Sequence, residues 1–166
     1  MNIYNPLENM RVTSKFGNRV HPVTRVYKLH NGIDLGGANG TPILAPQKGV
    51  VKSIYSNSTG GKQLIIEHAN GYTTGYAHLD GYNVNVGDTV KNGQVVAFLG
   101  STGLVTGPHL HFTLKKDGDY LDPEEELKNR SFFVKNQRSI LIILVLMLIA
   151  GTIQFIKNRN YGLRIR

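Results

Sequence analysis

The stretch GVVKSIYSNSTGGKQLIIEHANGYTTGYAHLD, residues 49–80, determines the expected fold class. Its β-branched and aromatic residues form short runs that glycine and asparagine interrupt, and Asn70-Gly71 is a strong signal for a hairpin turn. Five such runs follow one another along the chain: 49–55, 63–68, 72–78, 94–99 and 109–115. The sequence therefore predicts a mainly β protein, with an antiparallel β-sheet or barrel-like sandwich over residues 11–123.

One short helix is expected after this β-rich region, at residues 123–128. Asp122 suits the N-cap, Pro123 suits the first turn, and the glutamates at 124–126 lie where the helix dipole favours negative charge.

The composition restricts the chemistry that a site in this chain can use. The 166 residues suit one domain and a modest remainder, and 40% of them are hydrophobic, so a packed core can form. The chain has no cysteine, which excludes disulfides, thiolate zinc sites and cysteine nucleophiles. Any bound metal must be held by histidine, aspartate or glutamate.

The net charge of +8 is confined to the last part of the chain. Residues 1–127 contain 11 Lys and Arg and all 11 Asp and Glu, so the remaining 8 positive residues lie in 128–166. A neutral domain with a basic tail does not have the composition of a nucleic-acid-binding protein, and we expect no nucleic-acid partner.

The basic tail contains 18 uncharged residues, Ser139 to Ile156, between Arg138 and Lys157. A helix of that length spans about 27 Å, and flanking cations can extend to the interface of a hydrocarbon core of about 30 Å. We expect a transmembrane helix at 139–156, rather than a buried helix, since no face of 141–148 is polar. A basic linker at 124–138 precedes it and a basic tail at 157–166 follows.

Both the orientation and the route to the membrane stay open. Four cations lie on each side of the segment, so the positive-inside rule favours neither direction. Residues 1–10, read as an N-terminal extension, show no signal-peptide pattern. The chain is expected to be anchored by its C-terminal helix.

Three groups of residues carry metal-site chemistry. His109 and His111 are two apart on a strand, so they point to one face. His30 and Asp34 flank an Asn-Gly turn, and the carboxylate of Asp34 lies in an apolar run where burial without a cation is costly. His78 ends a strand of alternating polarity.

Two imidazoles and one carboxylate make a three-ligand zinc set with a fourth position open, which is the geometry of catalytic zinc. The other two histidines would then move the proton of the attacking water or stabilise the oxyanion. The pattern leaves open which of His109 and His111 is the ligand. Of the remaining histidines, His21 is a candidate for lining a groove and His68 is interpreted as an exposed hairpin residue.

At this level of detail the sequence resembles the lysostaphin/LytM-type zinc endopeptidases, which cut peptides of bacterial peptidoglycan. The resemblance covers residues 11–123 and rests on motifs in family order: SKFGNRVHP (14–22), HNGID (30–34), GYTTGYAHL (71–79), VGDTVKNGQ (86–94) and GSTGLVTGPHLHF (100–112). It implies that His30, Asp34 and His111 hold Zn2+. It also implies that His109 and His78 are catalytic, with His109 as the general base and His78 supporting the transition state.

The resemblance leaves two functions to compare. All five family positions are filled, which favours a membrane-anchored zinc endopeptidase over an inactive peptidoglycan-binding or activator module in a bacterial membrane. We expect a lytic enzyme that a phage carries in its virion membrane and uses in host entry, with the bacterial cell envelope as the alternative location. The bond that is cut, a glycine bridge or a stem bond of D-Ala and diaminopimelate, and the oligomeric state stay open.

Overall fold

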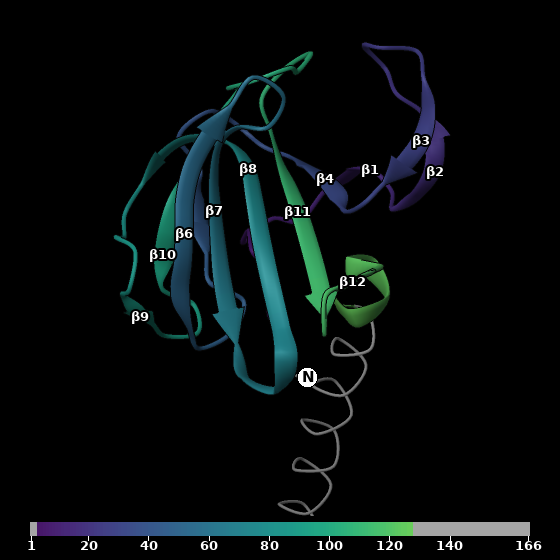
Figure 1. Ribbon diagram of the computed structural model, residues 1–166. Coiled ribbons are helices and arrows are strands. Elements are labelled where there is room, and N and C mark those ends of the chain that lie inside the picture. The colour runs from purple at the N-terminus through teal and green to yellow at the C-terminus, as the bar shows by residue number, and fades with distance from the viewer. Residues whose placement is uncertain (1–2, 128–166) are drawn as a thin grey trace, which may run out of the picture. The chain divides into compact units, whose positions relative to one another are not determined.

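A computed structural model describes residues 3–127, which form one large antiparallel sheet and a separate two-stranded hairpin (Figure 1). The sheet follows the order β1-β4-β11-β8-β7-β6-β9; β12 pairs with β11, and β10 pairs with β5 and β8. The strands are β1 (Val12–Ser14), β2 (Gly17–Val20), β3 (Tyr27–His30), β4 (Ile33–Gly36), β5 (Pro42–Leu44), β6 (Gly49–Asn57), β7 (Gly61–His68), β8 (Tyr72–Tyr82), β9 (Thr89–Val90), β10 (Val95–Leu99), β11 (His109–Lys116) and β12 (Asp119–Leu121). The predicted antiparallel β architecture is confirmed.

Strand β11 shows how the sheet separates core from site. Leu110, Phe112 and Leu114 are fully buried, whereas His109 and His111 point to the other face and are half-buried. This is the alternation that a strand imposes. The ring of Phe112 packs against that of Tyr76 on β8, with 5.5 Å between centroids. One face of β11 therefore builds the core, and the other is free to carry polar chemistry.

The β2–β3 hairpin lies outside the large sheet and was not predicted. Within residues 3–127 its two strands pair only with each other, and β1 and β4 connect it to the sheet on either side. Val20, Tyr27 and Leu29 on these strands are exposed, so burial does not impose the alternation by which a strand is recognised. Figure 1 shows the hairpin projecting at one side of the large sheet, next to β4.

The interpretation of His68 as an exposed hairpin residue is wrong, because its side chain is buried within a chain of hydrogen bonds. His68 Nδ1 donates to the carbonyl of Lys48 at 3.0 Å, so the neutral ring must accept at Nε2 from the hydroxyl of Thr74, at 2.7 Å. The Thr74 oxygen in turn accepts from the hydroxyl of Tyr76 at 3.0 Å. His68 is thus a satisfied core residue.

Burial lowers the pKa of His68 below its ordinary value of 6.5, against the opposing effect of the Lys48 carbonyl. The unfolded chain therefore takes up this proton at a higher pH than the folded chain. The contribution of His68 to stability is complete above pH 6.5 and is lost as pH falls through the lower, folded pKa.

We expect His68→Gln to flatten the fall of stability below pH 6.5, which urea unfolding at a series of pH values will measure. The protein should be kept metal-free with a chelator, so that loss of metal at low pH does not contribute. An unchanged slope in the variant would show that folding does not lower the pKa of His68.

The short helix begins as predicted. Residues 123–127 are helical, and Asp122 caps them by accepting a hydrogen bond from the backbone N–H of Glu124 at 2.9 Å. Within residues 3–127, no helix has the length and apolar character needed to cross a membrane. The predicted transmembrane helix at 139–156, the tail at 157–166 and all but the start of the linker at 124–138 lie outside the described residues.

Candidate metal centre and groove

The register between β4 and β11 brings the two halves of the candidate site together. Asp34 on β4 is paired with His111 on β11, and His30 ends β3 just before the turn into β4. Gly32 makes that turn possible, because a Cβ there would overlap the carbonyl oxygen of Phe112. Residues 81 positions apart in sequence thereby reach hydrogen-bonding distance.

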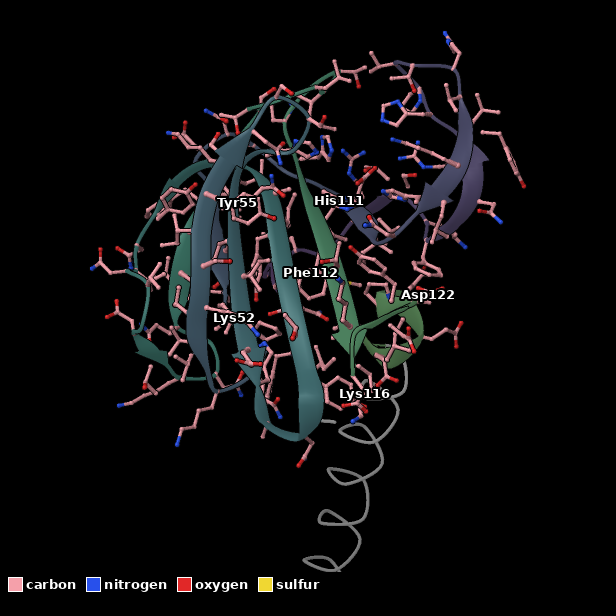
Figure 2. All side chains as sticks on the ribbon, viewed as in Figure 1. Lys52, Tyr55, His111, Phe112, Lys116 and Asp122 are labelled. Atoms are coloured by element: carbon pink, nitrogen blue, oxygen red, sulfur yellow. The ribbon has the colours of Figure 1, made fainter. Side chains whose placement is uncertain are left out.

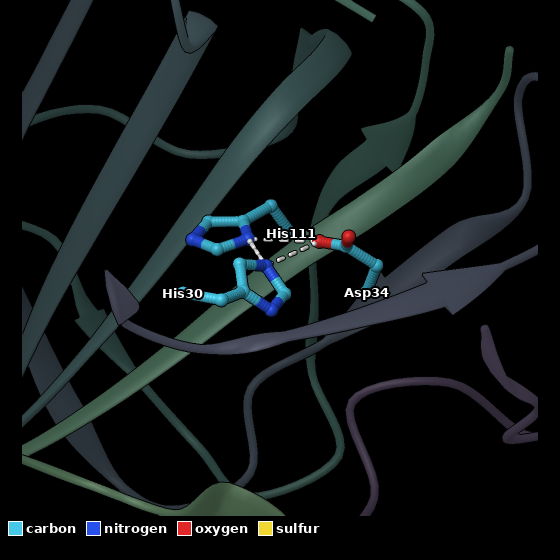
Figure 3. A group of neighbouring side chains, drawn as sticks. All are labelled: His30, Asp34 and His111. Carbon is cyan, nitrogen blue, oxygen red and sulfur yellow. Dashed lines mark hydrogen bonds and ion pairs between the residues drawn. The ribbon is translucent and has the colours of Figure 1, made fainter. Parts of the chain in front are cut away.

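Three side-chain atoms converge at the centre of this site (Figure 3). His30 Nε2 lies 3.1 Å from Asp34 Oδ1 and 3.1 Å from His111 Nδ1, and His111 Nδ1 lies 2.9 Å from Asp34 Oδ1. His30 is buried, and Asp34 and His111 are half-buried. The donor set of two imidazole nitrogens and one carboxylate oxygen suits zinc.

The outward-facing nitrogens of both rings determine what the inward-facing ones can do. His30 Nδ1 donates to the carbonyl of Lys15 at 2.7 Å, and His111 Nε2 donates to the Asn31 side-chain oxygen at 3.1 Å. In the neutral rings, both inward nitrogens then carry lone pairs. With the oxygen of Asp34, three acceptors face one point without a proton among them. The residues therefore fit a bound cation.

The charges around Asp34 favour its ionised form. Burial alone would raise the pKa of this carboxyl, but whenever His111 or His30 also carries a proton on its inward nitrogen, the hydrogen bond and positive charge of that ring hold the pKa well below its usual range. Its second oxygen, Oδ2, lies 3.3 Å from the guanidinium of Arg19 on β2. One carboxylate oxygen thus faces the metal position while the other is held by a cation.

A β-bulge directs His78 into the same site. Lys62 pairs with Leu79 and Leu64 with Tyr76, so β8 has one extra residue at Ala77-His78. His78 has a left-handed backbone conformation, φ 63°, which is uncommon outside glycine and often occurs at functional sites. The bulge lets adjacent residues 77 and 78 both face the site.

His78 and His109 form a second pair of imidazoles, with ring centroids 4.7 Å apart. His78 Nδ1 donates to the carbonyl of Thr102 and His109 Nδ1 to that of Gly107, each at 2.9 Å. Burial lowers the pKa of His78 to about 4, so the ring is neutral near pH 7. When these rings are neutral, Nε2 is the nitrogen that can accept a proton. Nε2 of His109 lies 3.8 Å from Oδ1 of Asp34.

All of these side chains line one open groove with a volume of about 700 Å³. Residues of the β2–β3 hairpin form one wall of the groove, and residues of the segments 57–63 and 104–108 also line it. Figure 2 shows His111 toward the end of the sheet at which the hairpin projects, and Lys116 at the opposite end. The groove is large enough for an extended peptide, and the metal position lies within it.

The structure thus brings the five predicted site residues together, and it places His21 in the groove wall as the sequence suggested. Sequence reasoning missed Arg19, Asn31 and Thr102, which form hydrogen bonds with the site residues Asp34, His111 and His78, respectively. All three lie inside the motifs quoted above, so the motifs contained a signal that single-residue reasoning did not use. Thr102 contacts His78 through its backbone carbonyl, which every residue type has, so the identity of residue 102 does not predict this contact.

Comparison with known proteins gives consistent matches over this region. A model of peptidase family M23 matches residues 28–123. The peptidoglycan DD-endopeptidase ShyC of Vibrio cholerae is 44% identical over 119 residues, covering 71% of this chain and 28% of that protein. Curated relatives are much longer, since the alignments cover 27% and 28% of the first proteins matched.

Two solved structures show the same fold. A zinc-containing peptidase from Vibrio cholerae matches with a TM-score of 0.70 and 35% identity, over 76% of this chain and 40% of that one. The catalytic domain of EnpA, a prophage-encoded M23 protein of Enterococcus faecalis crystallised as its A109H mutant, matches with a TM-score of 0.63 and 32% identity. That match covers 74% of this chain and 95% of the EnpA domain.

Proposed function

Because the chain belongs to peptidase family M23, we propose that it is a zinc endopeptidase that hydrolyses peptide cross-links of bacterial peptidoglycan. The observation that carries this proposal is the convergence of three metal-binding atoms and two further imidazoles in one open groove. The name of the Vibrio relative supports peptidoglycan as the substrate and a DD bond as the point of cleavage.

His30, Asp34 and His111 would hold the zinc ion. Zinc bound there would supply a Lewis acid that polarises the scissile carbonyl and lowers the pKa of a water molecule toward about 7, so that the water can lose a proton and act as the nucleophile. Lys15 and Asn31 fix the two imidazoles in the tautomers that ligation requires. Arg19 holds the second oxygen of Asp34, which leaves the first oxygen for the metal.

His109 is assigned as the general base, because in its neutral form Nε2 is free to accept a proton and lies near Asp34. Burial holds the pKa of His78 near 4, so His78 is a weak base near pH 7. It supports the transition state by accepting a hydrogen bond from the attacking water and orienting it. The carbonyls of Gly107 and Thr102 keep both rings in position.

The proposal is tested by digestion of purified peptidoglycan with the full-length protein in detergent. Zinc-loaded protein and a chelated sample are compared, and mass spectrometry identifies the new amine and carboxyl ends. We expect one defined new peptide end that requires zinc. Metal binding without cleavage of any wall type would instead support the alternative, an inactive peptidoglycan-binding or activator module.

The segment 139–156 supports a second part of the proposal, a membrane anchor for the enzyme. Its 18 uncharged residues are bounded by Arg138 and Lys157. We place the anchored enzyme in a phage virion membrane, and the prophage origin of EnpA supports an association of this kind of domain with phage. The bacterial cell envelope is the alternative location.

Two fractionations test the anchor and the location separately. The full chain is expected to stay with membranes in alkaline carbonate, and a chain ending at residue 138 is expected to be released. The protein should be found in purified phage particles. Its presence in membranes of uninfected bacteria would contradict the virion location, and release of the full chain by carbonate would contradict the anchor.

A further inference from the structure

The groove-facing side of the β2–β3 hairpin carries two cations directly opposite each other. Arg19 on β2 is paired with Lys28 on β3, and both line the groove. Lys28 is two residues from His30, which points to the metal position from the same strand. Directly paired residues and residues two apart share one face of a hairpin. Arg19, Lys28 and His30 therefore lie on the same face.

A third cation extends this charge along the groove. Arg11 also lines it, and its guanidinium lies over Gly36, the residue paired with His109. Asp34 is the only carboxylate among the described residues that line the groove. Three cations therefore face one carboxylate there, and a zinc ion would add two further positive charges.

Within the described residues these three cations have few ion-pair and hydrogen-bond partners. In the part of the chain that the structure describes, Arg19 has one ion pair, the 3.3 Å contact to Asp34, while its buried Nε has no hydrogen-bond acceptor. Neither Lys28 nor Arg11 forms an ion pair with an acid of residues 3–127. Like charges directly opposite on two strands destabilise the pair, so an anion at this position would relieve a local cost.

The arrangement suits a carboxylate on a bound peptide. Arginine offers a planar fork of donors and lysine a point charge, and both form charge-assisted hydrogen bonds with carboxylates. Stem-peptide cross-links of peptidoglycan bear free carboxylates beside their peptide bonds, whereas a glycine bridge bears none along its length. A positive wall would therefore favour the carboxylate-bearing class of cross-link.

We propose that Lys28 and Arg19, with Arg11 beyond them, form a subsite for a substrate carboxylate and select carboxylate-bearing stem cross-links over glycine bridges. The proposal rests on the proposed endopeptidase function and names its substrate class. Lys28 is the residue to change, because Arg19 also contacts Asp34 and its loss would disturb the metal position.

The test uses pairs of soluble cross-linked stem peptides, identical except that the carboxylates of one member are amidated. Full-length protein and its Lys28→Gln variant are loaded with zinc, and both KM and the peptide Kd are measured. Lys91→Gln is the matched control, since Lys91 is exposed and outside the groove. The thermal midpoint should not fall in Lys28→Gln, because the substitution removes like-charge repulsion.

For the parent protein and Lys91→Gln, we expect KM and Kd to be about three- to tenfold lower for the free carboxylate than for the amide. In Lys28→Gln this ratio should approach one, through weaker binding of the free carboxylate alone. Cleavage without any preference, or a preference that Lys28→Gln leaves intact, would overturn the subsite and leave the endopeptidase proposal standing. A Lys28-dependent preference in Kd without cleavage would support the subsite and overturn the proposed activity.

Discussion

Replacement of His109 by alanine is expected to lower kcat by about 10²- to 10⁴-fold while the protein keeps its zinc. His109 Nδ1 is occupied by the Gly107 carbonyl, and in the neutral ring Nε2 carries the lone pair that would take the proton of the attacking water. The side chain is not one of the three that converge on the metal position. Its removal should therefore affect proton transfer and leave metal binding intact.

The measurement combines single-turnover cleavage of peptidoglycan fragments with the zinc content and thermal midpoint of the same samples. His111→Ala is the matched substitution on the same strand, and it should lose zinc as well as activity. Parental activity in His109→Ala would place the base elsewhere. Loss of zinc from that variant would instead place His109 among the ligands.

The contrast between these two histidines shows the limit of prediction from the residues alone. Alternation places His109 and His111 on one face of a strand but does not say which of them reaches the metal. The family resemblance implied His111, and the register of β11 against β4 pairs His111 with Asp34 and His109 with Gly36. Pairing between distant strands is a tertiary property, and local periodicity carries no record of it.

In contrast, several strands of the large sheet could be predicted from local sequence. The runs expected at 49–55, 63–68 and 109–115 correspond to β6, β7 and β11, because burial of one face imposes an apolar pattern on the sequence. The β2–β3 hairpin has exposed apolar residues and a groove face that carries charge, so no such pattern marks it.

His78 shows a third way in which local reasoning fails. Simple alternation would put Ala77 and His78 on opposite faces of β8, and only the bulge against β7 lets both face the groove. The carbonyls that orient the histidines, those of Lys15, Thr102 and Gly107, are backbone atoms. Any residue type can supply a carbonyl, so the sequence does not mark these contacts.

The second large effect is expected at Asp34, where Asp34→Asn should abolish both zinc-dependent stabilisation and cleavage. The carboxylate is the only charged group among the three converging side chains, and its pKa is held low enough that it stays ionised at neutral pH. The asparagine amide has the same shape but is a weaker oxygen ligand for the metal. It also removes the ion-pair partner of Arg19, so Arg19 and Lys28 would face each other without a nearby anion.

Zinc at 100 times its Kd should stabilise the parent protein by about 2.7 kcal/mol, because it binds the folded state and not the unfolded one. Thermal unfolding with and without zinc measures this difference, and Asp34→Asn should show almost none of it. Asp80→Asn is the matched control, since Asp80 is exposed and lies outside the groove. If zinc raised the stability of Asp34→Asn as much as that of the parent protein, the metal would have to be held outside the groove. No other carboxylate among residues 3–127 lines the groove and could replace Asp34 there.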